Sequence, residues 1–166
     1  MATTIAAGMR IPAITVHRMG EDGPESVTTT DLFAGRCVVL VGVPGAFTPT
    51  CSSTHLPGFI VHADALKAAG ADAIVCMSVN DPFVMRAWGN SLNAEQIELI
   101  ADGNADLTRA LGMDIDLGAR GLGVRCRRFA LIADDGVVRH AAIEEGTALE
   151  ISSAEALLQV LQSTSP

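Results

Sequence analysis

The residues of this 166-residue sequence that are best suited to chemistry are its four cysteines, at positions 37, 51, 76 and 126. A cysteine acts as a nucleophile or a metal ligand in its thiolate form. The sequence contains no Cys-x-x-Cys pair and no close pairing of cysteine with histidine, so we expect no metal site. Because 49% of the residues are apolar and can form a core, free thiols in a reducing compartment are favoured over a disulfide framework.

Cys51 lies where a buried strand is expected to give way to a helix. Residues 37–43 form a continuous apolar run rich in valine, which is typical of a strand buried on both faces of a sheet. Two prolines and a glycine then interrupt regular structure over residues 44–50. Apolar residues at helical spacing predict a helix from Ser52 to Ala69. The sequence therefore places Cys51 at the start of a helix, after a tight loop.

This position suits a reactive thiol. In α/β sheets, ligands bind beyond the carboxyl ends of the strands, where the loop before Cys51 is expected. Unpaired N–H groups and the positive end of the helix dipole in the first turn favour thiolate over thiol. From position alone, a small hydrophobe at a helix start is an equal alternative for Cys51. Pro57 removes a backbone donor inside the helix, so we expect a kink or break near Thr54.

The rest of the chain continues the alternation of strands and helices. The other predicted elements are strands at 73–79 and 97–101, a helix from Asp81-Pro82 through Trp88, strands at 129–133 and 137–143 that form a hairpin around Asp134-Asp135-Gly136, and an amphipathic helix at 153–162. This order predicts an α/β fold with a central mixed sheet flanked by helices. The length is that of one domain, spanning residues 1–166.

Charge and hydropathy exclude several classes of partner. The formal net charge is −8 and the pI is near 4.8, which disfavours binding to nucleic acid or to an anionic membrane. No apolar run approaches the roughly 20 residues that cross a bilayer. Residues 1–10 lack the basic and apolar regions of a secretory signal, so we expect a cytoplasmic location. Small molecules and proteins are the expected partners.

The run around Cys51 carries a specific resemblance. Pro44-Gly45-Ala46-Phe47-Thr48-Pro49-Thr50-Cys51-Ser52 resembles the peroxiredoxin signature of proline, three residues, threonine, two residues and cysteine. Matching segments follow in the same order at His55-Leu56-Pro57-Gly58-Phe59, Met77 to Phe83, Trp88 and Arg127-Arg128-Phe129. The chain is similar to the type II, or peroxiredoxin-5-like, subfamily. This resemblance implies a thioredoxin fold and an antioxidant peroxidase that reduces hydrogen peroxide, alkyl hydroperoxides and often peroxynitrite, and we expect no cofactor.

The same resemblance implies roles for four residues. Cys51 would be the peroxidatic cysteine, Thr48 the hydroxyl that hydrogen-bonds thiolate and peroxide, Pro44 a wall against water, and Arg128 the source of positive charge. The chemistry needs such groups, because charge develops on the departing oxygen as sulfur attacks the peroxide. The backbone N–H groups of Thr50 and Cys51 are possible additional donors. Arg125 is a possible second helper, and Arg127 is expected to point elsewhere.

His55 and the aromatic residues allow other interpretations. His55 lies four residues after Cys51, the spacing of one helix face, which invites comparison with cysteine-histidine hydrolases. No residue to orient such a histidine is evident, so a packing or capping role is favoured. Trp88 and Phe47 are expected to lie in the core or at an interface, and otherwise at the rim of a peroxide pocket.

The sequence does not identify which thiol reduces Cys51 after it has been oxidised. A sulfenic acid must be reduced before further peroxide oxidises it irreversibly. Some relatives carry a resolving cysteine in the region matching residues 147–153, where this chain has Ile151 and no cysteine. Cys76 is a possible resolving residue, although inert burial is favoured, and Cys126 is a neighbour of the pocket if residues 126–128 are extended. We therefore expect one-cysteine chemistry, with glutathione or glutaredoxin, and less favourably thioredoxin, as the reductant.

The sequence also allows two alternative functions and a homodimer. The first alternative is a thioredoxin-like disulfide oxidoreductase, which the absence of Cys-x-x-Cys disfavours. The second is a redox sensor or holdase whose Cys51 is oxidised once and signals to a partner. Relatives commonly form a homodimer, and Phe47, Trp88 and Leu117 are candidates for such an interface.

Overall fold

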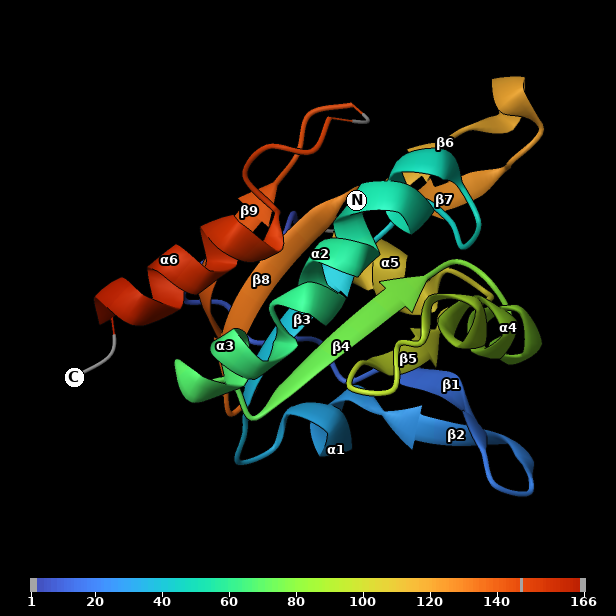
Figure 1. The fold of residues 1–166 in the computed structure, drawn as a ribbon. Coiled ribbons are helices and arrows are strands. Elements are labelled where there is room, and N and C mark those ends of the chain that lie inside the picture. The colour runs from blue at the N-terminus through green and yellow to red at the C-terminus, as the bar shows by residue number, and fades with distance from the viewer. Residues whose placement is uncertain (1–2, 147, 165–166) are drawn as a thin grey trace.

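A computed structural model describes residues 3–146 and 148–164, so Thr147 and the ends of the predicted 1–166 domain lie outside the described residues. The main sheet has seven strands in the order β2-β1-β5-β4-β3-β8-β9 (Figure 1). These strands are β1 (Thr15–Gly20), β2 (Gly23–Thr28), β3 (Cys37–Gly42), β4 (Ala73–Ser78), β5 (Glu98–Ala101), β8 (Phe129–Asp134) and β9 (Val137–Ile143). A separate two-stranded sheet joins β6 (Asp114–Asp116) to β7 (Val124–Cys126).

The sheet is mixed, as predicted. Strands β3, β4 and β5 are parallel, whereas β8 pairs with β3 and β9 with β8 in the antiparallel sense. Val41 of β3 lies between Cys76 of β4 and Ala130 of β8. All six residues of β4 are buried, because helices or packed segments cover both faces of the sheet.

Helices and other packed segments lie on the two faces of the sheet. The helices are α1 (Thr29–Phe33), α2 (Leu56–Val61), α3 (Ala63–Ala68), α4 (Pro82–Leu92), α5 (Asp106–Ala110) and α6 (Ala154–Thr164), with a 3-10 turn at Gly118–Arg120. Helices α2, α3, α4 and α6 pack on one face of the sheet, where Val39, Val41 and Cys76 point. Helices α1 and α5 pack on the opposite face with Val38, Leu40 and Val75. Among the described residues, no helix is long and apolar enough to span a bilayer.

The segment predicted as one helix from Ser52 to Ala69 is divided into three. A π-helical turn covers Cys51–His55, in which the Leu56 N–H donates to the Cys51 carbonyl. This turn confirms the interruption predicted near Thr54, because Pro57 lacks the N–H that a regular helix would require. A second break separates α2 from α3 at His62, where φ is −95° and ψ is 8°.

Several elements escape sequence prediction. The β1–β2 hairpin is mostly half-buried or exposed and has no apolar alternation strong enough to identify it. The described residues also contain the short elements α1, α5, β6 and β7, and α4 continues four residues beyond Trp88 to Leu92. Residues 126–128 do not form one strand, because β7 ends at Cys126 and β8 begins only at Phe129, so the condition for placing Cys126 on the face of Arg128 is not met.

Candidate active site

The loop before Cys51 begins at the carboxyl end of β3 and is fixed by neighbouring strands. The Ala46 N–H donates to Asn80 Oδ1 at 3.0 Å, and the Ser78 hydroxyl donates to the same oxygen. Asn80 therefore ties this loop to the end of β4. Gly42 is required at the end of β3, because a Cβ there would lie 2.0 Å from the Phe129 ring.

Cys51 and Arg128 meet inside the protein, 77 positions apart in sequence. Cys51 is fully buried, and only 2% of the Arg128 surface is exposed. Arg128 Nη2 donates to Cys51 Sγ at 3.4 Å. This contact places a permanent positive charge at the sulfur, an arrangement that stabilises a thiolate.

His55 holds the other side of the same guanidinium. Arg128 Nη1 lies 2.9 Å from His55 Nδ1, and His55 Nε2 lies 2.9 Å from the Ser152 carbonyl oxygen. The carbonyl can only accept, so Nε2 carries the proton and Nδ1 accepts from Arg128. Burial is the main cause that lowers the pKa of His55 to about 4; the Arg128 charge lowers it further, whereas the Ser152 hydrogen bond and the Glu144 charge raise it by less than burial lowers it.

These contacts give His55 a role that the sequence does not reveal. The ring packs edge-on against Phe59, which agrees with the predicted packing role. Both ring nitrogens are occupied by partners other than Cys51, so the geometry offers no base for a cysteine-histidine hydrolase. The spacing of His55 from Cys51 gives no indication of its contact with Arg128.

Glu144 anchors the segment that contacts His55. Its Oε2 accepts hydrogen bonds from the Ser152 N–H at 2.8 Å, the Ser152 hydroxyl at 2.7 Å and the Glu150 N–H at 2.7 Å. Burial opposes ionisation of Glu144, but these hydrogen bonds outweigh it and lower its pKa. No sequence motif marks Glu144 or Ser152, because the Glu144 carboxylate binds a loop in which Ser152 uses its backbone N–H and carbonyl as well as its hydroxyl.

A cleft of about 370 Å³ lies beside Cys51. Its lining residues are Pro44, Thr48, Pro49, Thr50, Leu117, Arg120, Leu122 and Arg128. The cleft thus combines three of the predicted site residues with an apolar wall. The Thr48 hydroxyl donates to the Gly45 carbonyl at 2.6 Å, so its proton is not directed at the sulfur, and its oxygen lone pairs remain as acceptors.

The neighbouring arginines and Trp88 have structural contacts. Arg125 donates to the carbonyl oxygens of Leu122 and Val79, so it binds loop backbone and not Cys51. Arg127 points away, as predicted, and donates to the Glu144 carbonyl. Trp88 is fully buried and donates to Ser52 Oγ at 2.9 Å, which makes it a core residue and not part of an interface or pocket rim.

Cys76 and Cys126 are both buried thiols. Cys76 lies in β4 within the same core cluster as Cys51, and burial, with the nearby Cys51 as a smaller cause, raises its pKa well above the ordinary value. Cys126 packs into the cluster on the opposite face of the sheet, where burial also raises its pKa. The conditional expectation that Cys126 neighbours the pocket is therefore not supported, because Cys126 packs into this cluster and does not line the cleft beside Cys51.

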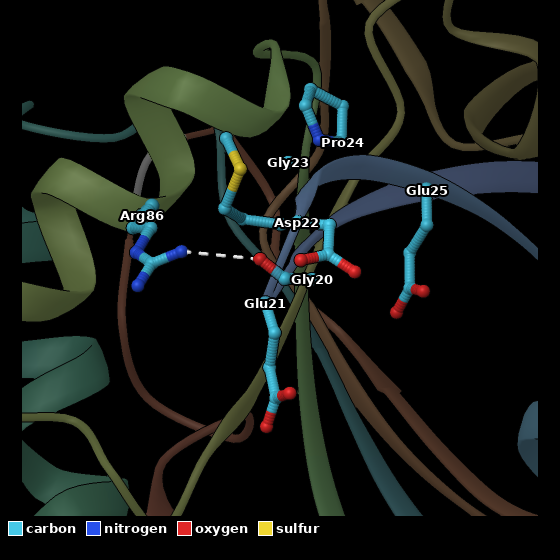
Figure 2. Close-up of a pocket in the computed structure, with 8 residues that line it drawn as sticks. Gly20, Glu21, Asp22, Gly23, Pro24, Glu25 and Arg86 are labelled. Atoms are coloured by element: carbon cyan, nitrogen blue, oxygen red, sulfur yellow. Dashed lines mark hydrogen bonds between the residues drawn. The ribbon is translucent and has the colours of Figure 1, made fainter.

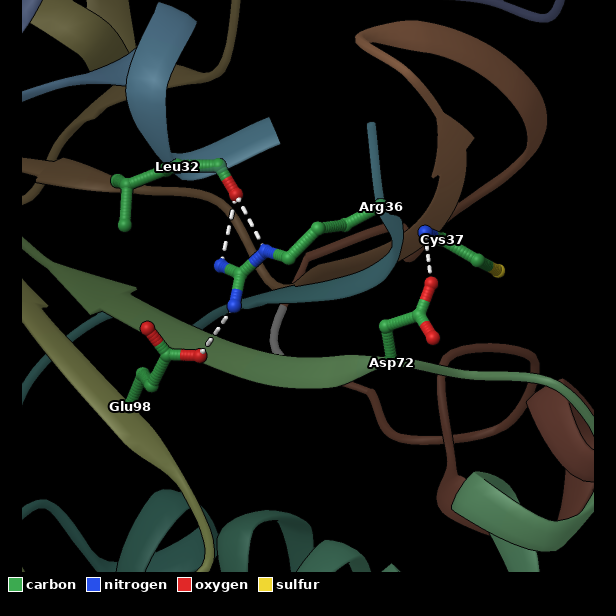
Figure 3. Close-up of polar contacts among 5 residues, drawn as sticks. All are labelled: Leu32, Arg36, Cys37, Asp72 and Glu98. Atoms are coloured by element: carbon green, nitrogen blue, oxygen red, sulfur yellow. Dashed lines mark hydrogen bonds and ion pairs between the residues drawn. The ribbon is translucent and has the colours of Figure 1, made fainter. Parts of the chain in front are cut away.

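Cys37 lies at the beginning of β3, among structural contacts. Its N–H donates to Asp72, and the adjacent Arg36 is held by the Leu32 carbonyl and Glu98 (Figure 3). Burial, followed by the hydrogen bond with Asp134, raises the pKa of the Cys37 thiol to about 11. In the described part of the chain, no cluster of histidine, cysteine and carboxylate side chains could hold a metal ion.

A larger cleft lies at the β1–β2 turn and carries no comparable chemistry. Figure 2 shows Arg86 of α4 donating to the Gly20 carbonyl, beside the acidic side chains of Glu21, Asp22 and Glu25. None of the residues lining this cleft is a cysteine or a histidine. Cys51 and its neighbours are therefore the candidate active site.

A mixed sheet with a buried cysteine at a helix start, and a guanidinium on its sulfur, defines a thioredoxin-like thiol peroxidase. A family model described as Redoxin matches residues 6–158. The chain is 53% identical to Peroxiredoxin-2E-2, chloroplastic, of Oryza sativa subsp. japonica, over 97% of this chain and 74% of that protein. It is 47% identical to Peroxiredoxin-2B of Arabidopsis thaliana, over 95% and 98% of the two chains.

A solved structure agrees with these relatives. Reduced Prx3 of Vibrio vulnificus in complex with hydrogen peroxide is 48% identical, with a TM-score of 0.92 over 95% of this chain and 99% of that chain. The chain therefore belongs to the Redoxin family and is a peroxiredoxin, with type II peroxiredoxins among its relatives. It is accordingly a thiol peroxidase with an antioxidant function, and the predicted family and fold are confirmed.

Proposed function

We propose that this peroxiredoxin reduces hydrogen peroxide and organic hydroperoxides through a sulfenic acid at Cys51. The single observation that carries the proposal is the 3.4 Å contact from Arg128 Nη2 to Cys51 Sγ beside a cleft. Arg128 lines the cleft and also contacts the sulfur, so the cleft is the path by which peroxide reaches Cys51.

The groups around Cys51 support each part of the reaction. The thiolate attacks the nearer peroxide oxygen, the O–O bond breaks, and the departing oxygen takes a proton to leave as water or an alcohol. Arg128 and the N–H groups of Thr50 and Cys51 stabilise charge on the departing oxygen. Thr48 accepts a hydrogen bond from the hydroperoxide O–H, because its own proton is given to Gly45. Pro44 lines the cleft and limits water at the site.

The cleft suits organic hydroperoxides as well as hydrogen peroxide. Pro44, Pro49, Leu117 and Leu122 provide apolar surface for an alkyl group, and the volume of about 370 Å³ far exceeds that of a water-sized molecule. The Vibrio vulnificus relative described in complex with hydrogen peroxide supports the smaller substrate.

The reductant is proposed to be an external thiol. Cys76 is fully buried, and its raised pKa keeps it a thiol, so it is poorly placed to attack the Cys51 sulfenic acid. Glutathione would displace water from the sulfenic acid to form a mixed disulfide. Glutaredoxin or a second glutathione then releases the Cys51 thiol, and thioredoxin is the less favoured alternative.

Steady-state peroxide consumption with glutathione and glutaredoxin tests this cycle. We expect turnover by the wild type and by Cys76→Ser at similar rates, and none by Cys51→Ser. Loss of turnover in Cys76→Ser would instead make Cys76 the resolving cysteine. Sustained turnover also separates the enzyme from a sensor that is oxidised once, and inactivity in insulin reduction separates it from a disulfide oxidoreductase.

Assembly and location are further parts of the proposal. Phe47 is 56% exposed on the active-site loop and Leu117 is half-buried beside the cleft, which favours a homodimer through this surface. Trp88, the third predicted interface residue, is buried in the core instead.

We propose a cytoplasmic location, while two similar relatives are named as chloroplastic. Sedimentation measures the assembly, and a labelled chain in cells shows the compartment.

A further inference from the structure

Arg128 has few partners for a buried cation. Nη2 contacts Cys51 and Nη1 contacts His55, whereas Nε is buried without a hydrogen-bond partner. The ion pairs found among residues 3–146 and 148–164 do not include Arg128. The orientation of the guanidinium at the sulfur therefore depends on His55.

We propose that His55, oriented by Ser152 and Glu144, is the positioning residue that holds the Arg128 guanidinium on the Cys51 sulfur. This inference rests on the proposed peroxidase chemistry of Cys51 and extends it to residues outside the peroxide cleft. His55 touches neither the sulfur nor the cleft, so its effect on the reaction passes through Arg128.

A neutral histidine is better suited to this task than a carboxylate. A carboxylate paired with Arg128 would balance its charge and weaken its attraction for the thiolate and the departing oxygen. Buried His55 stays neutral, so it fixes the guanidinium and leaves the full charge available to the reaction. The Ser152 carbonyl keeps the proton on Nε2, which leaves the Nδ1 lone pair facing Arg128.

The contacts that orient His55 return to the backbone of Arg128. The Glu144 N–H donates to the Arg128 carbonyl at 3.0 Å, and the Glu144 carboxylate accepts from the Ser152 N–H and hydroxyl. The Ser152 carbonyl then contacts His55, which contacts the Arg128 guanidinium. This closed circuit of hydrogen bonds ties the side chain of Arg128 to its own backbone and limits its movement.

Asparagine and glutamine at position 55 separate the two contacts of the ring. In His55→Asn, an amide oxygen can accept from Arg128 near the place of Nδ1, while the contact with Ser152 is lost. In His55→Gln, the amide reaches toward Ser152 and the contact with Arg128 is lost. Stopped-flow oxidation of Cys51 by hydrogen peroxide should fall about tenfold to hundredfold in His55→Gln and His55→Leu, and less in His55→Asn.

Four comparisons exclude a merely structural effect. Alkylation of Cys51 by iodoacetamide needs no stabilised oxygen leaving group, so the ratio of peroxide rate to alkylation rate should fall in His55→Gln. In a protein that already carries Arg128→Met, His55→Gln should change the rate of oxidation by peroxide by about twofold or less, because its effect passes through Arg128. The matched control is His62→Leu, because His62 contacts Gly58 and not Arg128. Glu144→Gln, which keeps an oxygen acceptor, should retain more peroxide activity than Glu144→Leu.

Specific results overturn the inference. Equal losses in His55→Asn and His55→Gln, or the same fold-loss in the Arg128→Met background as in the wild type, would show that His55 does not act through Arg128. If His55→Leu fails to fold, the Asn and Gln pair still decides the matter. A wild-type protein that reacts no faster than a free thiol would contradict the proposed function itself, which is a different result.

Discussion

At the scale of single residues, the site depends on an arginine that donates in two directions at once. Arg128 reaches Cys51 and His55 with different nitrogens, and a lysine ammonium cannot span both because it is a single point charge. Arg128→Lys should slow oxidation of Cys51 by hydrogen peroxide about a hundredfold, as measured by stopped flow. Alkylation by iodoacetamide serves as the control, and a rate close to wild type would argue against the two-sided contact.

Thr48 provides a second prediction at this scale. Its hydroxyl donates to Gly45, which leaves lone pairs to accept from the hydroperoxide. Thr48→Val removes this acceptor at nearly constant volume and should lower kcat/KM for peroxide about tenfold, whereas Thr48→Ser should retain most of it. Equal activity of the Val and Ser variants would mean that the hydroxyl takes no part.

The sequence predicts the nucleophile better than its partners. Cys51 is marked by local pattern, because a buried strand, a proline-rich loop and a helix follow one another. Arg128 is 77 positions away and was accessible only through the family resemblance. His55, Ser152 and Glu144 were missed as a network, because their contacts join the helix after Cys51 to a loop 97 positions later and use backbone atoms that carry no residue-specific signal.

At the scale of elements, close packing at the end of β3 supports the site. A Cβ on Gly42 would overlap the ring of Phe129, the residue after Arg128. Gly42→Ala should therefore lower the free energy of unfolding by about 2 kcal/mol and slow the peroxide reaction by displacing Arg128. Urea denaturation measures the first effect and stopped flow the second.

Gly58→Ala is the matched control for this substitution. A Cβ on Gly58 of α2 would meet only Ala154 Cβ, at an ordinary 3.9 Å, so alanine should be neutral or stabilise the helix by about 0.5 to 1 kcal/mol. Similar stabilities for the two alanine variants would contradict the packing argument.

Elements with strong apolar patterns were predictable, and weak ones were not. The β3, β4, β8 and β9 strands match their predicted ranges to within one residue. Buried apolar runs identify β3, β4 and β8, and the turn residues Asp134-Asp135-Gly136 identify the hairpin of β8 and β9. The π-helical turn was foreseen only as an interruption, since Pro57 shows where a hydrogen bond is missing but not how the backbone compensates. The β1–β2 hairpin was missed because its residues are largely exposed.

At the scale of the whole molecule, the buried network makes stability depend on pH. The pKa of His55 is about 4 when folded and 6.5 ordinarily, so the unfolded chain takes up a proton first as the pH falls. The contribution of neutral His55 to the free energy of unfolding is fully present above pH 6.5. It is lost progressively as the pH falls toward 4, by up to about 3 kcal/mol. Glu144, whose pKa is also lowered, adds a further loss that begins as the pH falls below about 4.5.

Urea denaturation between pH 4 and 7 measures this dependence. The free energy of unfolding of the wild type should fall as the pH is lowered over this range. The slope should be smaller in His55→Asn, because asparagine at position 55 does not titrate. Gly58→Ala is the control, because it changes no titratable group and should keep the wild-type slope. An unchanged slope in His55→Asn would contradict a neutral, buried His55.

The most direct test of the central claim is stopped-flow fluorescence of Trp88 after reduced protein is mixed with hydrogen peroxide. Trp88 donates to Ser52, next to Cys51, so its emission should report oxidation of that sulfur. The structure predicts a reaction orders of magnitude faster than that of an ordinary free thiol, with no response in Cys51→Ser. Equal responses in the two proteins, or none in either, would contradict Cys51 as the peroxide-reducing residue.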